Sequence, residues 1–218
     1  MHHAATACDR LVPRGAAHGL SVRRRPTPGS STPAGRPWST RTVPVPLTTA
    51  RLTLLPWALT TEAHRDGLVT AWDDPEVWHW VGAGRDGFTR ADLDSAIERA
   101  TAQGRLDDEF LVVRTCDGTV LGVCGLYPSS NDGGDPAEWD LGYRYGRLSW
   151  GQGHGFEAAA EVLRWAREER GLRRVGSNAQ LPNEASHRIL RRLGFTPIGT
   201  RPDSRDPART TLWYAWTA

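Results

Sequence analysis

The chain has 218 residues, of which 39% are hydrophobic and ten are tryptophan, so it can form one domain with a substantial core, with or without a tail. No run of about 18 apolar residues occurs, and this excludes a membrane-spanning helix of ordinary length. The cysteines Cys8, Cys116 and Cys124 are too few for a disulfide framework and lack the Cys-x-x-Cys spacing of a zinc site. We therefore expect no metal and a cytoplasmic location.

The net charge of +2 is unevenly distributed. Residues 1–48 are rich in Pro, Ser, Thr and Gly and contain seven arginines against one acid, so the rest of the chain is net acidic. Such a segment cannot bury enough surface to offset its ordering entropy, and we expect residues 1–48 to be a disordered tail and residues 49–218 the folded domain. The tail is either a basic arm for nucleic acid, a ribosome or a targeting receptor, or an extension without a selected role. We expect no nucleic-acid binding by the acidic domain.

In chain order, the domain begins with a predicted strand at residues 51–55. Residues 61–72 and 89–104 have helical spacing, and Thr89 is placed to cap the second helix. Residues 110–114 and 120–127 are apolar runs on either side of Cys116-Asp117-Gly118-Thr119, a pattern typical of a β-hairpin.

After a polar loop, residues 138–145 form another predicted strand. Residues 152–170 predict a long amphipathic helix, because Phe156, Ala159, Leu163 and Ala166 fall on one face. A strand at 175–179, a helix at 184–193 and strands at 197–200 and 211–216 follow. The order β-α-α-β-β-β-α-β-α-β-β indicates an α/β layer fold around a mixed sheet.

Three glycines in five residues, Gly151, Gly153 and Gly155, lie between a predicted strand and the long helix. Glycines leave backbone N–H groups unshielded, and at a helix N-terminus such groups favour an anion, for example a pyrophosphate. A tight turn without a ligand would give the same pattern. A Walker loop is excluded because no Gly-Lys-Ser/Thr follows, and a Rossmann site is disfavoured because three strands precede the loop.

Two motifs carry a family resemblance. Gly142-Tyr143 followed by Trp150-Gly151-Gln152-Gly153-His154-Gly155-Phe156-Glu157-Ala158 resembles the acetyl-CoA-binding motif of the GNAT superfamily, Arg/Gln-x-x-Gly-x-Gly/Ala, in the form of its RimJ/RimL-type branch, where Trp is frequent at the first position. Asn183-Glu184-Ala185-Ser186 and Leu190-Arg191-Arg192-Leu193-Gly194-Phe195 are similar to the family's Asn-x-x-Ser … Lys-x-Gly-Phe helix.

The resemblance covers about residues 50–217. It implies a GNAT fold, with a mixed sheet of about six to seven strands flanked by about four helices. It also implies an acetyl-CoA-dependent N-acetyltransferase that moves the acetyl group by direct attack, in a ternary complex, to a primary amine of a protein N-terminus or a small molecule. The alternative is a non-catalytic acyl-CoA-binding module. A homodimer is compatible with either.

The resemblance further implies roles in cofactor binding. The backbone amides of the glycine loop would hold the pyrophosphate: Gln152, Gly153, His154, Gly155 and Phe156. The backbone of Tyr143, Arg144 and Tyr145 would pair with the pantetheine arm. Asn183 and Ser186 would lie on the far side of the cofactor, and Arg188, Arg191 and Arg192 form either a 3′-phosphate contact or a solvated helix end.

For catalysis, Asp140 occupies the acidic position before Gly-Tyr, and Glu138 projects from the same strand face, so either would accept the amine proton. The position at which many family members carry a tyrosine acid is Leu190, so Ser186 is expected to protonate the sulfur. The alternatives are that the acids bind a cationic acceptor or lie at a solvated strand edge, and that Ser186 bonds its own backbone.

The acceptor region of the family corresponds to about residues 57–90. Trp72, Trp78, His79 and Trp80 could line a pocket, but tryptophans are more often core residues, and we expect a core role. Acidic residues nearby, Asp73, Asp74 and Glu76, fit either a cationic amine or a capped helix end.

Overall fold

The structure is a computed structural model that describes residues 45–81, 85–103, 105–129, 139–203 and 206–218. The chain divides into two units, Met1–Val43 and Pro44–Ala218, and the described residues belong to the second. Most of the expected tail, residues 1–44, lies outside the described residues. Leu47–Thr48, also assigned to the tail, instead form the first strand of the sheet, because Leu47 is buried in the core. The domain therefore starts before the predicted boundary at residue 49.

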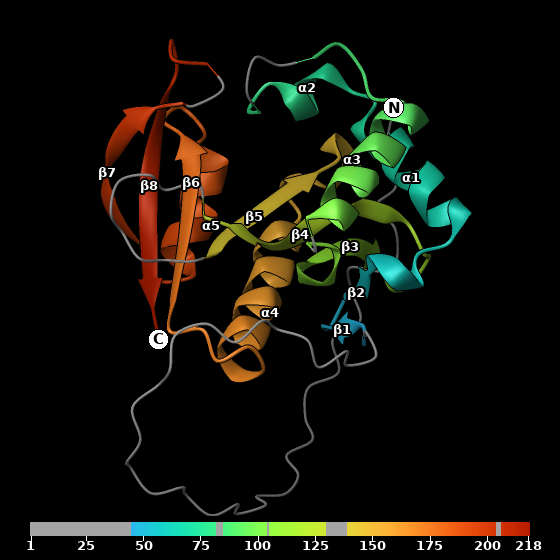
Figure 1. The fold of residues 1–218 in the computed structure, drawn as a ribbon, viewed down its shortest axis with the longest axis horizontal. Helices are drawn as coiled ribbons and strands as arrows, with labels where there is room; N and C mark the ends of the chain where they lie inside the picture. Colours follow the sequence, from blue (N-terminus) through green and yellow to red (C-terminus); the bar gives the residue numbers. More distant parts are fainter. Residues whose placement is uncertain (1–44, 82–84, 104, 130–138, 204–205) are drawn as a thin grey trace, which may run out of the picture. The chain divides into compact units, whose positions relative to one another are not determined.

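A mixed sheet of eight strands organises the described part of the chain (Figure 1). Its strand order is β1-β2-β3-β4-β5-β6-β8-β7, and all neighbours are antiparallel except β5 and β6, which are parallel. The strands are β1 (Leu47–Thr48), β2 (Leu52–Pro56), β3 (Glu109–Arg114), β4 (Val120–Pro128), β5 (Trp139–Tyr145), β6 (Arg174–Gln180), β7 (Thr196–Pro202) and β8 (Thr210–Thr217). The predicted α/β class is confirmed, and the two-residue β1 accounts for the strand beyond the expected seven.

Five α-helices flank the sheet: α1 (Glu62–Trp72), α2 (Pro75–Trp78), α3 (Arg90–Ala102), α4 (His154–Glu168) and α5 (Glu184–Arg192). Thr61 and Thr89 begin α1 and α3 with capping boxes. The one-turn α2 was not predicted from the sequence, because four residues carry no periodic signal. Asp74 caps it by accepting a hydrogen bond from the Glu76 amide at 2.9 Å. No helix in the described ranges is long and apolar enough to cross a membrane.

Each face of the sheet buries its own core. Helices α4 and α5 contribute Ala158, Val162 and Leu190 to one cluster, together with inward-facing residues such as Leu126 on β4. Helices α1 and α2 contribute Leu68, Trp72, Val77 and Trp78 to the other. The sheet is thus covered on both faces, as an α/β layer fold requires.

Because Leu126 is 1% exposed within the first core, Leu126→Ala should lower the free energy of unfolding by about 2–5 kcal/mol, the cost of lost burial and a cavity. Leu148→Ala removes the same atoms from a side chain that is 95% exposed and should change stability by less than about 0.5 kcal/mol. Urea unfolding of both variants measures the difference, and equal effects would contradict the assigned core.

Candidate active site

Strands β5 and β6 separate after a single point of contact. They pair only at Asp140 with Gly176, whereas β4 pairs with β5 along the full length of β5. On the side of β5 that faces β6, the Leu141 carbonyl accepts a hydrogen bond from Ser177 Oγ at 2.8 Å. From there to Tyr145 the two strands leave a gap in the sheet.

Backbone direction along β5 decides which residues face this gap. The Gly146 amide donates to the Leu121 carbonyl of the neighbouring segment at 2.8 Å, and N–H and C=O groups alternate sides along a strand. The groups of Arg144 therefore point to β4, while those of Tyr143 and Tyr145 point into the gap. The backbone N–H and C=O groups of Arg144 are engaged in the β4–β5 ladder and cannot also pair with a ligand in the gap. The expectation that the Arg144 backbone contacts the pantetheine arm together with Tyr143 and Tyr145 is therefore corrected.

The side chain of Arg144 has a separate place. Its guanidinium carbon lies 4.1 Å from the centre of the Trp78 ring and 4.8 Å from that of Trp72. Trp72 and Trp78 are 6% and 7% exposed, which confirms the expected core role, although Trp72 also borders the cavity described below. Arg144 is thus held in a fixed position on the α1–α3 face of the sheet.

The glycine loop places an uncapped helix N-terminus at the end of this gap. Gly151 and Gly153 have φ of 75° and 81°, a conformation that side chains rarely adopt. Gly153 is the N-cap of α4 and offers no side-chain oxygen to the first-turn amides, those of His154, Gly155 and Phe156. These amides and the helix dipole together favour an anion, as the sequence predicted.

The side chains of the glycine loop differ in where they lie relative to the cavity. Gln152 donates to the Leu148 carbonyl at 2.6 Å, and His154 is 1% exposed beneath the loop. His154 can therefore meet a ligand through its backbone only. Phe156 borders the cavity, and the Arg192 guanidinium carbon lies 3.9 Å from the centre of its ring.

A half-buried carboxylate fixes the loop to the start of the domain. Glu157 accepts hydrogen bonds from Thr49 Oγ1 at 2.6 Å, from the Arg51 amide at 3.0 Å and from Arg51 Nε at 2.7 Å. Arg51 Nη1 also donates to the Gln152 carbonyl at 3.1 Å. Partial burial opposes ionisation of Glu157, but these donors outweigh it and lower the pKa of Glu157 below its ordinary value of 4.5.

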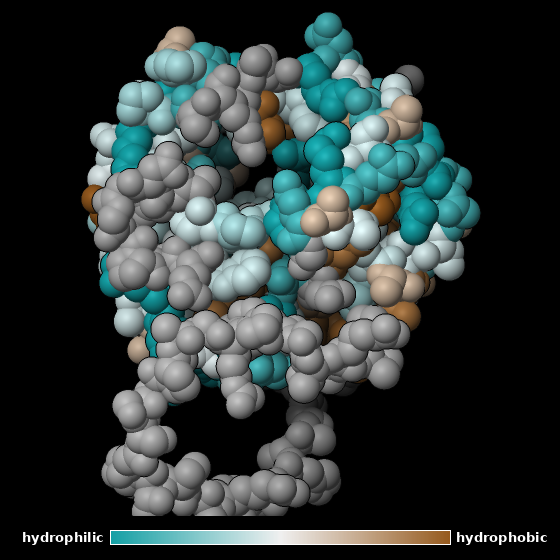
Figure 2. All heavy atoms as spheres, in the orientation of Figure 1, coloured by the Kyte–Doolittle hydropathy of each residue, from teal (hydrophilic) through white to brown (hydrophobic). Residues whose placement is uncertain are grey.

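A cavity of about 1270 Å³ joins the loop, the gap and the α1–α3 face. Its lining includes Gly153 and Phe156 of the glycine loop, Tyr143 and Ser177 of β5 and β6, and Trp80 after α2. Figure 2 shows this face hollowed between the β6–β8 strands and the helices. A long ligand could therefore meet the helix N-terminus and the open strand edge at once.

Ser186 borders the cavity, and its hydroxyl meets a residue of β5. Tyr143 Oη and Ser186 Oγ are 2.8 Å apart, so Ser186 is not the helix serine bonded to its own backbone that was the alternative. Asn183 is the N-cap of α5 and accepts a hydrogen bond from the Ser186 amide at 3.1 Å. The Asn-x-x-Ser spacing thus has a structural cause: the asparagine caps the helix that positions the serine.

Asp140 borders the same cavity on the α1–α3 face. It is 8% exposed, and Ser129 Oγ donates to its Oδ1 at 3.1 Å. The second expected acid, Glu138, lies outside the described residues. A different carboxylate, Glu109, borders the cavity on this face, because Glu109, Gly125 and Gly142 lie in one row across the sheet. No motif or spacing in the sequence indicates Glu109, because only the strand register brings it to the cavity.

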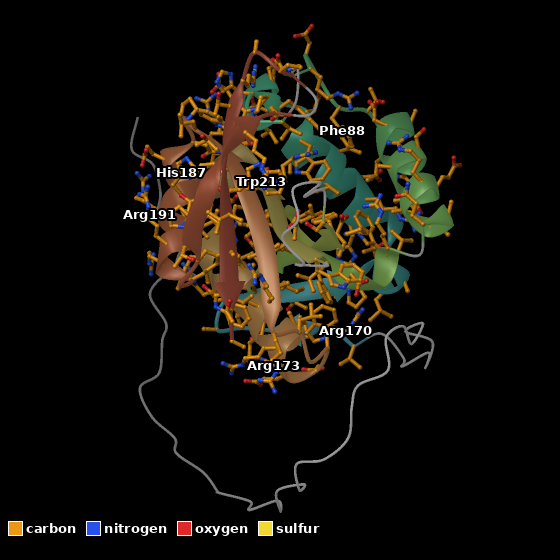
Figure 3. The ribbon with its side chains drawn as sticks, turned by 60° about the vertical axis from the view of Figure 1, so that its left-hand side comes forward. Phe88, Arg170, Arg173, His187, Arg191 and Trp213 are labelled. Atoms are coloured by element: carbon orange, nitrogen blue, oxygen red, sulfur yellow. The ribbon has the colours of Figure 1, made fainter. Side chains whose placement is uncertain are left out.

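The expected acceptor region supplies one wall of the cavity. Trp80 and Val81 follow α2 on this wall, and Thr211 and Trp213 of β8 lie on the other. Figure 3 shows Trp213 on β8 and Phe88 on the side of α1 and α3. Nearby acids serve as caps: Asp74 begins α2, and Asp73 Oδ1 accepts a hydrogen bond from the Phe88 amide at 3.1 Å.

Arg209 connects the two walls. Its Nη1 donates to the His79 carbonyl at 2.6 Å and to Gln180 Oε1 at 3.1 Å, and its Nε pairs with Asp206 at 3.1 Å. His79 precedes Trp80, and Gln180 ends β6, so this contact ties the helical side to the strands beside the cavity. A link over such a sequence separation carries no signal in the sequence itself.

Because Glu157 has a lowered pKa in the folded chain, it stabilises the fold above pH 4.5, and this contribution is lost as the pH falls through the lower folded value. Glu157→Gln should therefore cost about 1 kcal/mol at pH 7, a modest value because water still screens the partners, and the cost should shrink below pH 4.5. Urea unfolding at several pH values measures it. A pH-independent cost for Glu157→Gln would contradict the account.

Comparisons with known proteins agree with this geometry. Residues 51–196 match the family model described as acetyltransferase (GNAT) domain. The chain is 27% identical over 159 residues to "Uncharacterized N-acetyltransferase p20" of Bacillus licheniformis, covering 72% of this chain and 85% of that protein. It is 30% identical over 162 residues to "FsC-acetyl coenzyme A-N(2)-transacetylase" of Aspergillus fumigatus, covering 71% of this chain and 66% of that protein.

A solved structure of RimL, named a ribosomal L7/L12 alpha-N-protein acetyltransferase in complex with coenzyme A, superposes with a TM-score of 0.62. It shares 16% sequence identity, and the match covers 79% of this chain and 98% of that one. At this identity the likeness concerns the fold. The family match spans the glycine loop, the open edge of β5 and the Asn-x-x-Ser helix, and the chain belongs to the GNAT acetyltransferase domain family.

Proposed function

We propose that the chain transfers the acetyl group of acetyl-CoA to a primary amine by direct attack, as a member of the RimJ/RimL-type branch. The observation that carries the proposal is the cavity in which the open edge of β5 continues into the uncapped N-terminus of α4. The loop amides from Gln152 to Phe156 fit a pyrophosphate, and the Tyr143 backbone fits the amides of a pantetheine arm. The far end of the cavity is left for the amine.

The residues of the chain supply what amine acylation requires. Asp140 accepts the proton that the amine loses as its nitrogen attacks the thioester carbon, directly or through water. The carbon–sulfur bond then breaks, its electron pair goes to sulfur, and the Ser186 hydroxyl supplies the thiol proton. Because Ser186 lies in the first turn of α5, the helix dipole also favours the negative charge that develops on sulfur.

The surroundings of Asp140 favour a cationic amine as acceptor. Asp140 and Glu109 place two carboxylates on one face, and Trp80 borders the same cavity, where an aromatic face attracts a cation. The names of the relatives, an N(2)-transacetylase and an alpha-N-protein acetyltransferase, both describe nitrogen acceptors. Small molecules and protein N-termini are therefore the two acceptor classes to compare.

Asp140→Asn should lower kcat about 10²- to 10⁴-fold, because the amide cannot take the amine proton, while the KM for acetyl-CoA stays within about twofold. Thiol release from acetyl-CoA is the measurement, with polyamines, aminoglycosides, amino acids and Ser- or Ala-starting peptides as acceptors. Asp94→Asn, which removes an exposed carboxylate on α3, is the control and should leave turnover unchanged.

Two results would contradict the proposal in different ways. Unchanged turnover of Asp140→Asn would remove Asp140 from the mechanism. A wild-type chain that binds acetyl-CoA and releases no thiol with any acceptor class would instead identify a non-catalytic acyl-CoA-binding module.

A further inference from the structure

Tyr143 borders the cavity and offers a hydroxyl in addition to its backbone at the open edge of β5. Its Oη lies 2.8 Å from Ser186 Oγ and 3.4 Å from the Ser186 carbonyl oxygen. Both residues border the cavity, and Tyr143 packs against the α4–α5 core. A strand residue and a helix residue thus form one pair of hydroxyls beside the route expected for the thioester.

In a hydroxyl pair of this kind, one O–H remains available as a hydrogen-bond donor. The two oxygens share one hydrogen bond, which uses one of their two protons, and the other O–H can donate to a third atom. A phenol is a far stronger acid than an alcohol, with ordinary pKa values near 10 for tyrosine. The favoured arrangement therefore has Tyr143 donating to Ser186 Oγ, which leaves the Ser186 proton directed at a neighbour in the cavity.

The three other serine and threonine hydroxyls that border the cavity have their protons engaged. Ser177 donates to the Leu141 carbonyl and Ser149 to the Gly146 carbonyl, both at 2.8 Å, and Thr211 donates to the Arg201 carbonyl at 3.2 Å. Leu190, the position at which family members often carry a tyrosine, is fully buried in the core.

We propose that Tyr143 is the proton source behind Ser186 for the departing thiol. As the carbon–sulfur bond breaks and its electron pair moves to sulfur, the Ser186 proton passes to sulfur and the Tyr143 proton passes to Ser186 Oγ. The phenolate regains a proton from solvent once the products leave, and Asp140 releases the amine proton to solvent. This inference rests on the proposed acetyl transfer and adds a residue that acts through Ser186.

The setting of the pair supports this role. Asn183 accepts a hydrogen bond from the Ser186 amide in the first turn of α5, so the backbone that carries the serine is fixed by the helix cap. Burial raises the pKa of Tyr143, although the hydrogen bond with Ser186 works against this shift, so the phenol is fully protonated at neutral pH when the reaction begins. The N-terminus of α5 partly offsets the negative charge left behind.

Tyr143→Phe tests the proposal, because it keeps the packed ring and the backbone edge and removes one hydroxyl. We expect kcat to fall about 10- to 100-fold, while the KM for acetyl-CoA and the Kd for desulfo-CoA, which lacks the thiol, stay within about twofold. Tyr214→Phe is the matched control: its hydroxyl lies 2.9 Å from His187 Nδ1, away from the cavity lining, and turnover should be unchanged.

A proton inventory separates proton relay from a structural role. The rate is measured in mixtures of light and heavy water. For the wild type, its dependence on the deuterium fraction should indicate two protons transferred in the rate-limiting step. For Tyr143→Phe, it should indicate one proton fewer. An unchanged kcat in Tyr143→Phe, an unchanged inventory, or loss of desulfo-CoA binding together with kcat would each overturn the inference while leaving the wild-type activity intact. Absence of thiol release by the wild type would overturn the proposed function first, and this inference with it.

Discussion

The divergence of β5 and β6 is the constraint on which the site depends. Two parallel strands that pair at Asp140 and Gly176 and then separate leave backbone groups of β5 without their usual partners. Ser177 and Trp150 satisfy the Leu141 and Tyr145 carbonyls with side-chain donors, each at 2.8 Å. Tyr143 lies between them, and its backbone is the part of this edge that a ligand can pair with. A sheet that closed here would be more regular and would have no cavity.

The elements around the gap hold it open from both sides. β4 fixes β5 along its whole length, and β8 fixes β6 in the same way, so each strand is secured by its outer neighbour. Glu157 ties the glycine loop to Thr49 and Arg51 at the start of the domain. The helix N-terminus that would receive the pyrophosphate is therefore fixed by contacts that a bound ligand need not supply, as preorganised binding requires.

Much of the fold could be predicted because its signals are local. Periodicity predicted α1, α3, α4 and α5 within a few residues, and the spacing of Gly151, Gly153 and Gly155 predicted the glycine turn from which α4 begins. The sequence did not predict β1 or α2, since two- and four-residue elements carry no period. Contacts that depend on strand register, such as the place of Glu109 beside the cavity, also carry no local signal.

Some of the site residues could likewise be predicted from local motifs, whereas the contacts of others depend on the fold. Asp140 and Ser186 were chosen by motif, and the structure brings both to one cavity. Tyr143 was chosen for its backbone, whereas its hydroxyl meets Ser186 across a separation of 43 residues, which no spacing rule connects. Arg144 was grouped with Tyr143 because they are neighbours in the chain, although alternation along a strand sends their backbones to opposite sides. The motifs thus identified the residues of the site. The direction in which their backbone and side-chain groups point became known only from the strand pairing in the sheet.

The most direct test of this account is residue-resolved amide hydrogen exchange with and without coenzyme A. If the open edge of β5 holds the pantetheine arm, the Tyr143 amide should become protected when coenzyme A is added, together with the loop amides of Gly155 and Phe156. The Arg144 amide, already paired with β4, should not change. Equal protection of Tyr143 and Arg144, or protection confined to the loop, would contradict the assignment of the gap as the cofactor site.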